Sequence, residues 1–235
     1  MEDIPDNIKA LLAQQSAEIL AAQKDIGDKL YQQLEALTSL TSILPIRYPL
    51  PPMRGWAISP DFGVLLVSEI LNKKPYVVVE LGSGVSTLLI AYCLELVGHG
   101  RIVSYDHDAK YCAQSRENIK RHNLERFAEV VHAPLTSVQL EQGQWDWYDT
   151  AKINKDEPLD LLVIDGPPGQ IQTNSRYPAL PLLHTHFSGN TTVLMDDAAR
   201  PDEKTIVDMW TQEFPEFTSE FITAEKGAVI LRRCR

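Results

Sequence analysis

A buried strand that runs straight into a glycine turn and a helix is the stretch of this sequence best suited to bind a ligand. It reads VVVELGSGVST over residues 77–87. Gly82 and Gly84 let the backbone approach a ligand closely, and the start of a helix offers free N–H groups. A tight strand–helix turn without a ligand would need the same two glycines, so the loop alone does not decide between the two interpretations.

A carboxylate at the end of the next apolar stretch favours a ligand. Asp106 lies 22 residues after Gly84, where it can accept hydrogen bonds from two ribose hydroxyls. Thr87 replaces the third glycine of a dinucleotide fingerprint, and the Gly-Lys-Ser/Thr of a phosphate loop is absent. Glu80 would repel a pyrophosphate but suits a cationic sulfonium amino acid. We therefore expect an adenosine-type cofactor, and a nicotinamide oxidoreductase is disfavoured.

Three further carboxylates follow later apolar stretches. Asp165 precedes Gly-Pro-Pro-Gly, and Asp196 and Asp197 follow the next apolar run. Ends of adjacent parallel strands lie about 4.8 Å apart, so these groups can converge. They would repel one another unless a proton or a cation is shared, and Mg²⁺ held there could activate a substrate hydroxyl. The alternative is that Asp165 contacts only cofactor or water, while Asp197 caps a helix or pairs with Arg200.

Asp165 is the first candidate for a catalytic base, because an attacking hydroxyl must lose its proton. His184 and His186 are further catalytic candidates, although a histidine on such a helix more often packs or faces solvent. The candidate substrate contacts for an acidic or sugar acceptor are Arg176, Tyr177 and Arg200. The aromatic stretch WDWYD at 145–149 is interpreted as packing under a loop, and not as a site.

Apolar runs alternate with amphipathic stretches, which predicts a parallel sheet covered on both faces. The expected strands are 76–81, 101–105, 128–132, 160–165 and 192–196. The expected helices are 60–72, 86–97, 108–122, 177–186 and 202–213. Two last strands, 217–223 and 227–233, form a hairpin, so one strand must run antiparallel.

The first 44 residues predict a separate element. Apolar residues recur over 5–44 at spacings of three, four or seven, a narrow stripe typical of a coiled coil, although Gln15 and Gly27 weaken it. Such a stripe needs a partner, and a second subunit is favoured over the chain's own core. The expected organisation is a helical oligomerisation segment (1–44), a stiff proline-rich joint (45–55) and a cofactor-binding domain (56–235).

The glycine loop and its acidic partner resemble a known family. ELGSGVST (80–87) followed by VSYDHD (103–108) is similar to motifs I and II of class I S-adenosylmethionine-dependent methyltransferases, in the branch with a later IDGPPG. The resemblance covers roughly residues 54–233, and Ser86 stands where many members carry a glycine. It implies an α/β Rossmann-like fold, with a seven-stranded sheet of order 3-2-1-4-5-7-6 and an antiparallel last strand.

The same resemblance assigns cofactor contacts. Those to the methionine part are Glu80, Gly82, Ser83, Gly84 and Ser86. Those to the adenosine part are Asp106 at the ribose and His107, Pro134 and Leu135 at the adenine. Asp165 also contacts the cofactor, and Trp56 and Ser59 close over it; packing in the core or the joint is an equal interpretation for Trp56.

Asp165, Asp196 and Asp197 also resemble the metal ligands of catechol-type and macrolide-sugar O-methyltransferases, although DGPPG is not what the sugar enzymes carry. The implied reaction is O-methylation of a sugar, glycan or small polar metabolite, with S-adenosylmethionine as cofactor and Mg²⁺ considered as a second. An aminopropyl transferase of the same fold is one alternative. A non-catalytic cofactor-binding subunit is another, but it would be expected to lose these carboxylates.

Composition limits the remaining classes. A net charge of −10 argues against nucleic acid as a partner, since phosphate binding needs a basic surface. Cys93, Cys112 and Cys234 form no paired motif, which predicts free thiols in a reducing compartment. We find no signal-peptide pattern and no apolar run of the roughly 20 residues that a membrane span needs. These features together predict a cytoplasmic protein.

Overall fold

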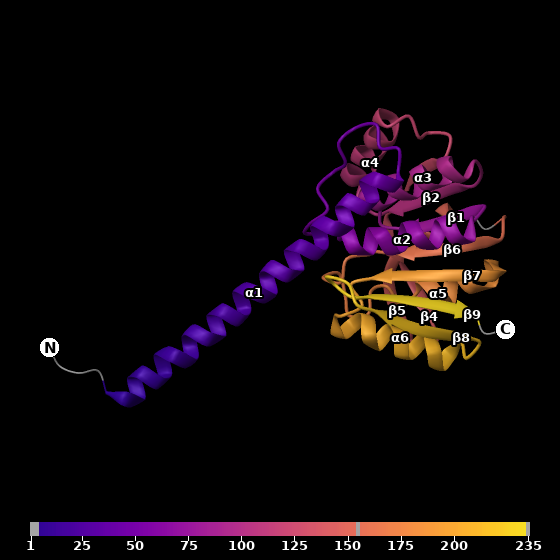
Figure 1. Ribbon diagram of the computed structural model, residues 1–235. Helices are drawn as coiled ribbons and strands as arrows, with labels where there is room; N and C mark the ends of the chain where they lie inside the picture. The colour runs from indigo at the N-terminus through magenta and orange to yellow at the C-terminus, as the bar shows by residue number, and fades with distance from the viewer. Residues whose placement is uncertain (1–4, 154–155, 234–235) are drawn as a thin grey trace.

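Seven strands form one sheet in the order β3-β2-β1-β6-β7-β9-β8, in a computed structural model that describes residues 5–153 and 156–233 (Figure 1). The strands are β1 (Val77–Leu81), β2 (Arg101–Asp106), β3 (Ala128–His132), β6 (Leu159–Ile164), β7 (Phe187–Asp196), β8 (Phe217–Ile222) and β9 (Ala228–Arg233). β9 runs antiparallel to both of its neighbours. The predicted fold class, strand order and antiparallel last strand are confirmed.

Helices cover both faces of this sheet because successive strand residues point to opposite sides. Val78 and Leu161 pack into a core with α2 (Pro60–Lys73), α3 (Val85–Val97) and part of α4 (Ala109–Arg121). Val79 and Leu162 pack into a second core with α5 (Ala179–Leu183) and α6 (Pro201–Glu213). The continuous Val/Ile/Leu runs that predicted a sheet buried on both faces therefore reflect two separate cores.

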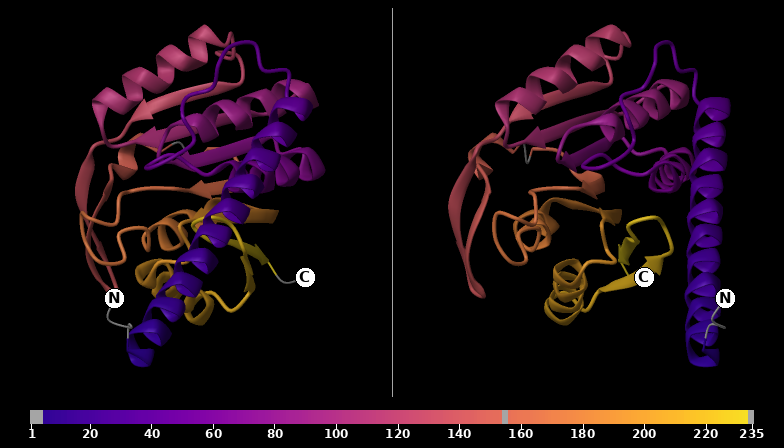
Figure 2. Two further views of the ribbon diagram at one scale, coloured as in Figure 1. Left: turned by 60° about the vertical axis from the view of Figure 1, so that its left-hand side comes forward. Right: turned by 90° about the vertical axis from the view of Figure 1, so that its left-hand side faces the viewer.

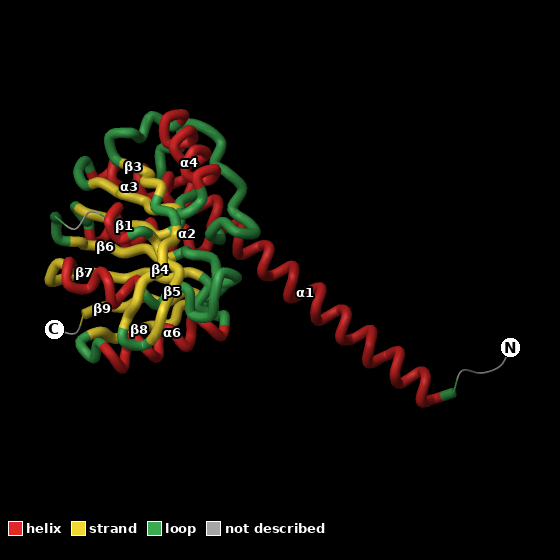
Figure 3. Tube along the Cα trace, turned by 180° about the vertical axis from the view of Figure 1, so that it is seen from behind, coloured by secondary structure: helices red, strands yellow, loops and turns green. Residues whose placement is uncertain are grey.

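A hairpin that the sequence analysis missed completes the second core. β4 (Leu135–Leu140) and β5 (Gly143–Tyr148) pair antiparallel outside the main sheet (Figure 3). Trp145 and Trp147 of β5 are buried on either side of the exposed Asp146, and Tyr148 at the end of the strand is buried as well. Alternating burial is the pattern of a half-exposed strand, so WDWYD is part of a strand and not packing under a loop.

The helix predicted over 177–186 is wrong in its extent. α5 covers only Ala179–Leu183, and a 3₁₀ turn over His184–His186 leads into β7. β7 begins at Phe187, five residues before the predicted start of that strand. Pro178 is the N-cap of α5 and the 3₁₀ turn follows the helix directly, so the regular helix is limited to five residues.

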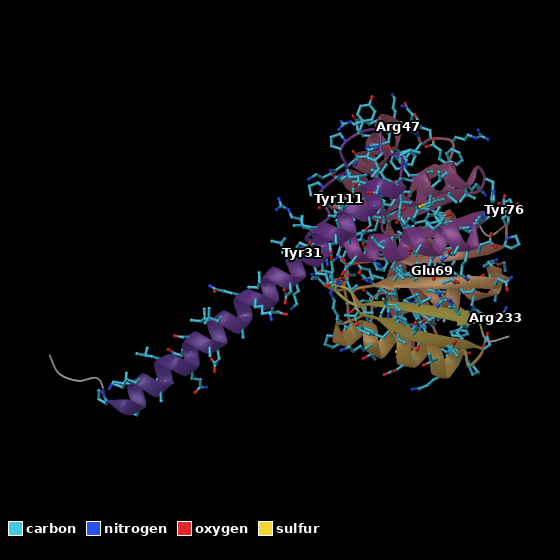
Figure 4. The ribbon with its side chains drawn as sticks, viewed as in Figure 1. Tyr31, Arg47, Glu69, Tyr76, Tyr111 and Arg233 are labelled. Atoms are coloured by element: carbon cyan, nitrogen blue, oxygen red, sulfur yellow. The ribbon has the colours of Figure 1, made fainter. Side chains whose placement is uncertain are left out.

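α1 (Asp6–Ile43) leaves the domain as one long helix (Figures 1 and 2). Only its last turns pack, where Leu40 and Leu44 are buried in the first core. The proline-rich joint is fixed to α3, since the backbone N–H of Arg47 donates to Tyr92 Oη at 3.0 Å (Figure 4).

Among the described residues, no helix combines the length and apolar character needed to cross a membrane. Cys93 and Cys112 are buried free thiols, as expected. Cys234 lies outside the described residues.

Candidate active site

A cavity of about 540 Å³ opens where β1, β2 and β6 end. β2 and β6 flank β1 on opposite sides, so the strand order reverses there, which is where open α/β sheets bind ligands. The predicted cofactor contacts that line this cavity are Trp56, Gly82, Ser83, Gly84, Ser86, Asp106, His107 and Asp165. The sequence therefore located the cavity correctly.

Gly82 makes the sharp turn that brings the loop against the end of β6. Its φ is +98°, and a Cβ there would lie 3.3 Å from the backbone of Asp165. Its N–H donates to Tyr105 O at 2.8 Å. A side chain would therefore strain the backbone and crowd β6, so the glycine is required whether or not a ligand is bound.

Glu80 lies beneath the loop and does not line the cavity. Thr87 Oγ1 donates to Glu80 Oε2 at 2.5 Å and accepts the Gly84 N–H at 3.0 Å. Burial raises the pKa of Glu80 to about 7. Glu80 and Thr87 thus hold the loop from below, which is not the predicted contact between Glu80 and the methionine part.

Asp106 is held in place by hydrogen bonds from the glycine loop and from the residue two positions after it. The Ser83 N–H and Oγ donate to Asp106 Oδ2 at 3.0 and 2.7 Å, and the Asp108 N–H donates to Oδ1 at 3.0 Å. Because each carboxylate oxygen accepts more than one hydrogen bond, Asp106 keeps acceptor capacity toward the cavity. Three of the about four acceptor sites of the carboxylate are used by these bonds, so the remaining site, on Oδ1, suits one ribose hydroxyl.

Three other predicted contacts lie away from the cavity. Ser59 is buried, and its Oγ donates to Asp61 Oδ1 at 2.5 Å. Pro134 and Leu135 are not among the lining residues, because the chain turns into β4 at Leu135. Trp56 lines the cavity but is 67% exposed. A role for Trp56 in core packing is therefore wrong, and its side chain stands at the rim.

Tyr148 is a lining residue that the sequence analysis missed. It ends β5, and its hydroxyl is buried without a hydrogen-bond partner among the described residues. Burial raises the pKa of Tyr148 well above 10, so the phenol is a neutral donor. Alternation in WDWYD predicts a strand, but it sets Tyr148 on the same face as the exposed Asp146, so no sequence signal marked Tyr148 as a residue of the cavity.

The predicted carboxylate cluster forms at the ends of β6 and β7. Asp165, Asp196 and Asp197 each place an oxygen within 4.8 Å of the others. Arg176 Nη2 lies 2.7 Å from Asp197 Oδ2 and 3.5 Å from Asp165 Oδ1. Arg200 Nη2 lies 2.9 Å from Asp197 Oδ1, as the alternative interpretation of Asp197 expected.

Lys226, from the turn between β8 and β9, supplies another cation. Its ammonium donates to Ala57 O at 2.9 Å and to Asp196 Oδ2 at 3.2 Å. Burial, and secondly the charge of Asp196, raise the pKa of Asp165 well above its usual value. No sequence signal connected this turn lysine with the cluster, since the contact joins residues 30 positions apart.

The cations beside the carboxylate cluster determine whether a divalent ion would fit there. Asp196 Oδ1 and Asp197 Oδ1 are both buried without a hydrogen bond from the described residues, which would suit a cation. Both oxygens of Asp197 already lie within 3 Å of guanidinium nitrogens, however, and the Lys226 ammonium is 3.2 Å from Asp196. A dication at the cluster would sit beside these fixed positive charges. The residues as arranged do not fit Mg²⁺.

The predicted acceptor contacts are not free to bind an acceptor. Arg176 is buried, and its two terminal nitrogens donate also to the backbone oxygens of Asp165 and Asp196 at 2.8 and 2.9 Å. Tyr177 is buried, and its hydroxyl donates to Glu213. Arg200 pairs with Asp197 outside the cavity lining. Arg176 instead joins the ends of β6 and β7.

The two candidate histidines lie at the opposite end of the strands from the cavity. His184 and His186 precede the start of β7, whereas the cavity lies at the ends of the parallel strands. The His184 ring packs against Phe214 at 4.6 Å between centroids. The prediction that either is catalytic is wrong, because the helix expected to carry them toward the cavity is only five residues long.

The cavity fits an adenosine cofactor with a cationic amino-acid end. Its volume lies within the range of small-molecule sites. Asp106 offers an acceptor for a ribose, and the unpartnered Tyr148 hydroxyl offers a buried donor. The start of α3 at Val85 and the nearby carboxylate of Asp165 complete a set of groups suited to S-adenosylmethionine.

Comparison with known proteins gives the same answer. A family described as a methyltransferase domain matches residues 79–198, just over half of the chain. No curated protein matches the chain by sequence. A methyltransferase from Podospora anserina bound to S-adenosylhomocysteine is similar in structure, with a TM-score of 0.60, 16% identity and 100% of both chains covered.

Two O-methyltransferases share the fold. The enzyme from Bacillus cereus, in complex with S-adenosylhomocysteine, has a TM-score of 0.60, 19% identity and coverage of 91% of this chain and 97% of that chain. The Streptomyces achromogenes enzyme of tomaymycin synthesis, in complex with S-adenosylmethionine, has a TM-score of 0.60, 16% identity and coverage of 89% and 96%. The chain belongs to the methyltransferase-domain family and is a class I S-adenosylmethionine-dependent methyltransferase.

Proposed function

We propose that this enzyme methylates a hydroxyl oxygen of a sugar or another small polar metabolite. The observation that carries the proposal is Asp165, a carboxylate that lines the cavity next to the glycine loop. A base with a raised pKa accepts a proton well near neutral pH, and an alcohol must lose its proton as it attacks. The O-methyltransferases among the similar structures agree with an oxygen acceptor.

When bound, S-adenosylmethionine supplies an electrophilic methyl group on its sulfonium. Asp106 and Tyr148 hold and orient that cofactor, and alignment of the acceptor supplies much of the rate. Asp165 takes the proton of the acceptor hydroxyl while the new O–C bond forms and the C–S bond breaks. The products are a methyl ether, S-adenosylhomocysteine and a proton on Asp165.

We propose further that fixed cations take the place of a metal in this reaction. Arg176 and Lys226 lie within ion-pair distance of all three carboxylates. They offset the mutual repulsion of Asp165, Asp196 and Asp197, which a divalent ion would otherwise have to do. This replaces the Mg²⁺ assistance that the sequence led us to consider.

The base is tested by comparing Asp165→Asn with Asp146→Asn, an exposed carboxylate on β5. The assay follows S-adenosylhomocysteine release with a panel of sugars, polyols and catechols. Asp165→Asn is expected to lower kcat about 100-fold or more, well beyond any change in its affinity for S-adenosylhomocysteine, while Asp146→Asn keeps both turnover and affinity. Unchanged turnover in Asp165→Asn would show that Asp165 is not the catalytic base. Methylation of amines but of no hydroxyl would overturn the proposal that the acceptor atom is oxygen.

A further inference from the structure

The exposed part of α1 carries a row of large apolar side chains. Every described side chain between Asn7 and Gln32 is exposed, and Ile19, Ile26 and Leu30 are 58%, 65% and 60% exposed. Helix stability in proteins comes mostly from packing an apolar face. A helix of 38 residues that packs only at one end therefore needs a partner along the rest.

The same face of α1 that contacts its own domain continues into solvent. Leu12, Ile19 and Ile26 follow one another at steps of seven residues, and Gln33 and Leu40 continue the series. Gln33 Nε2 donates to Asp61 Oδ2 at 2.8 Å, and Leu40 is buried in the first core. The domain thus covers the C-terminal end of the row and leaves its N-terminal part open (Figures 1 and 2).

We propose that this open row pairs with the α1 helix of a second copy, running antiparallel. In a parallel pair the second helix would have to occupy the place where the first domain packs on Leu40, and the two domains would collide. In an antiparallel pair the domains lie at opposite ends. One register then sets Leu12 opposite the partner's Leu37 and Ile19 opposite the partner's Leu30.

Charge placement supports this orientation. Glu18 and Lys29 are eleven residues apart, which is about three helical turns, so they flank the row on the same side. In an antiparallel pair, the side of the apolar row that carries Glu18 and Lys29 on one helix faces the same side of the other helix. The register that joins Ile19 to Leu30 brings Glu18 of each helix near the partner's Lys29. The Lys29 ammonium lies 2.7 Å from Asp25 of its own helix, so Glu18 would join an existing ion pair, twice by the two-fold symmetry.

The exposed apolar area of the row is similar in size to one side of a standard protein–protein interface. The apolar residues of the row are Ile8, Leu11, Leu12, Ile19, Ile26, Leu30, Leu34 and Leu37, exposed by 37–65%. Together they offer roughly 700 Å² of apolar surface per helix, close to the about 800 Å² per partner of a standard interface.

A membrane surface is a poorer match for this helix. α1 contains five acidic residues and three lysines. Helices that lie on membranes carry Lys and Arg on their polar face, so the acidic surplus of α1 disfavours anionic lipid.

The first test is molar mass by light scattering and sedimentation over a range of concentrations. The wild-type chain is expected at twice its monomer mass. The double variant Ile19→Lys/Leu30→Lys should be monomeric, with the dissociation constant raised at least about 100-fold by placing charges in the interface. The matched control Leu20→Lys/Tyr31→Lys changes similarly exposed apolar residues, which helical spacing places roughly 100° around α1 from Ile19 and Leu30, and it should remain dimeric.

The second test fixes the orientation by oxidative cross-linking. Leu12→Cys combined with Leu37→Cys should link two chains, whereas neither single variant should do so above the wild-type background. A monomeric wild type, or equal dimerisation of both lysine variants, would overturn the proposal, as would binding to phosphatidylglycerol vesicles without dimer formation. Affinity for S-adenosylhomocysteine is measured in each variant, so loss of the methyltransferase fold is distinguished from loss of the interface.

Discussion

Tyr148 shows at the scale of one residue why the cavity fits a ligand. Its hydroxyl is buried at the cavity wall and has no hydrogen-bond partner in the part of the chain that the structure describes. Leaving a buried donor unpaired costs about 1–3 kcal/mol. A bound cofactor that accepts this hydrogen bond would recover that cost.

Tyr148→Phe should therefore change affinity and stability in opposite directions. Losing the hydroxyl should weaken binding of S-adenosylhomocysteine about 3- to 10-fold in calorimetric titration. The unliganded protein should be equally or more stable to heat, because a buried unpaired group is removed. Tyr76→Phe is the control, since Tyr76 is 66% exposed at the other edge of the sheet (Figure 4). Unchanged affinity in Tyr148→Phe would show that the hydroxyl does not contact the cofactor.

Glu80 predicts a pH dependence of stability. In the unfolded chain its carboxyl ionises near pH 4.5, whereas burial raises the pKa in the folded chain to about 7. The protonated folded form is therefore favoured at low pH, and stability is lost as the pH rises from about 4.5 to 7. The loss attributable to this group is about 3 kcal/mol.

Glu80→Gln removes this titration and keeps an acceptor for Thr87. Urea unfolding at pH 5 and pH 8 should show a smaller loss of unfolding free energy in the variant than in the wild type. Parallel pH profiles for the two proteins would mean that Glu80 is ionised in the folded state.

At the scale of elements, two strand ends and one turn converge on the carboxylate cluster. β6 and β7 deliver the carboxylates, and the turn between β8 and β9 delivers Lys226. Mg²⁺ at millimolar concentration, or a chelator, is therefore expected to leave turnover and melting temperature unchanged. Lys226→Gln removes the nearest ammonium, so calorimetry should detect Mg²⁺ binding in that variant only. Wild-type turnover that is lost with chelator and restored by Mg²⁺ would contradict the fixed-cation proposal.

The elements that the sequence predicted are those with a strong local signal. β1 and α3 are joined by two glycines, and each parallel strand is a short run of Val, Ile and Leu. The 22-residue spacing to Asp106 placed the second carboxylate correctly in the cavity. These signals depend only on neighbours in the chain, which is why they could be interpreted without a structure.

The rest depended on contacts between distant parts of the chain. Arg176 looked like a loop arginine open to an acceptor, but it is buried between two strand ends. The β4–β5 hairpin has no Asn-Gly or Asp-Gly turn to mark it, and so Tyr148 was missed. The three carboxylates cluster as the sequence predicted. The prediction of a metal there could not take account of Lys226, because its contact with Asp196 depends on the tertiary fold.

At the scale of the whole molecule, the chain combines a two-core α/β domain with a helix that extends from the side where the parallel strands end (Figure 1). The family match runs from within β1 to just past the end of β7 and leaves α1, α2, α6 and the last hairpin outside. Those outer parts carry the proposed dimer contact and the turn with Lys226. Features specific to this chain are therefore expected there.

Binding of S-adenosylhomocysteine to the wild type and to Asp106→Ala tests the central claim most directly. Titration calorimetry should show tight binding to the wild type and at least about 10-fold weaker binding to Asp106→Ala, because hydrogen bonds to a carboxylate contribute about 1.5–3 kcal/mol each. Asp146→Ala should bind like the wild type. No binding to the wild type, or equal affinity in Asp106→Ala, would contradict the assignment of this cavity as the cofactor site.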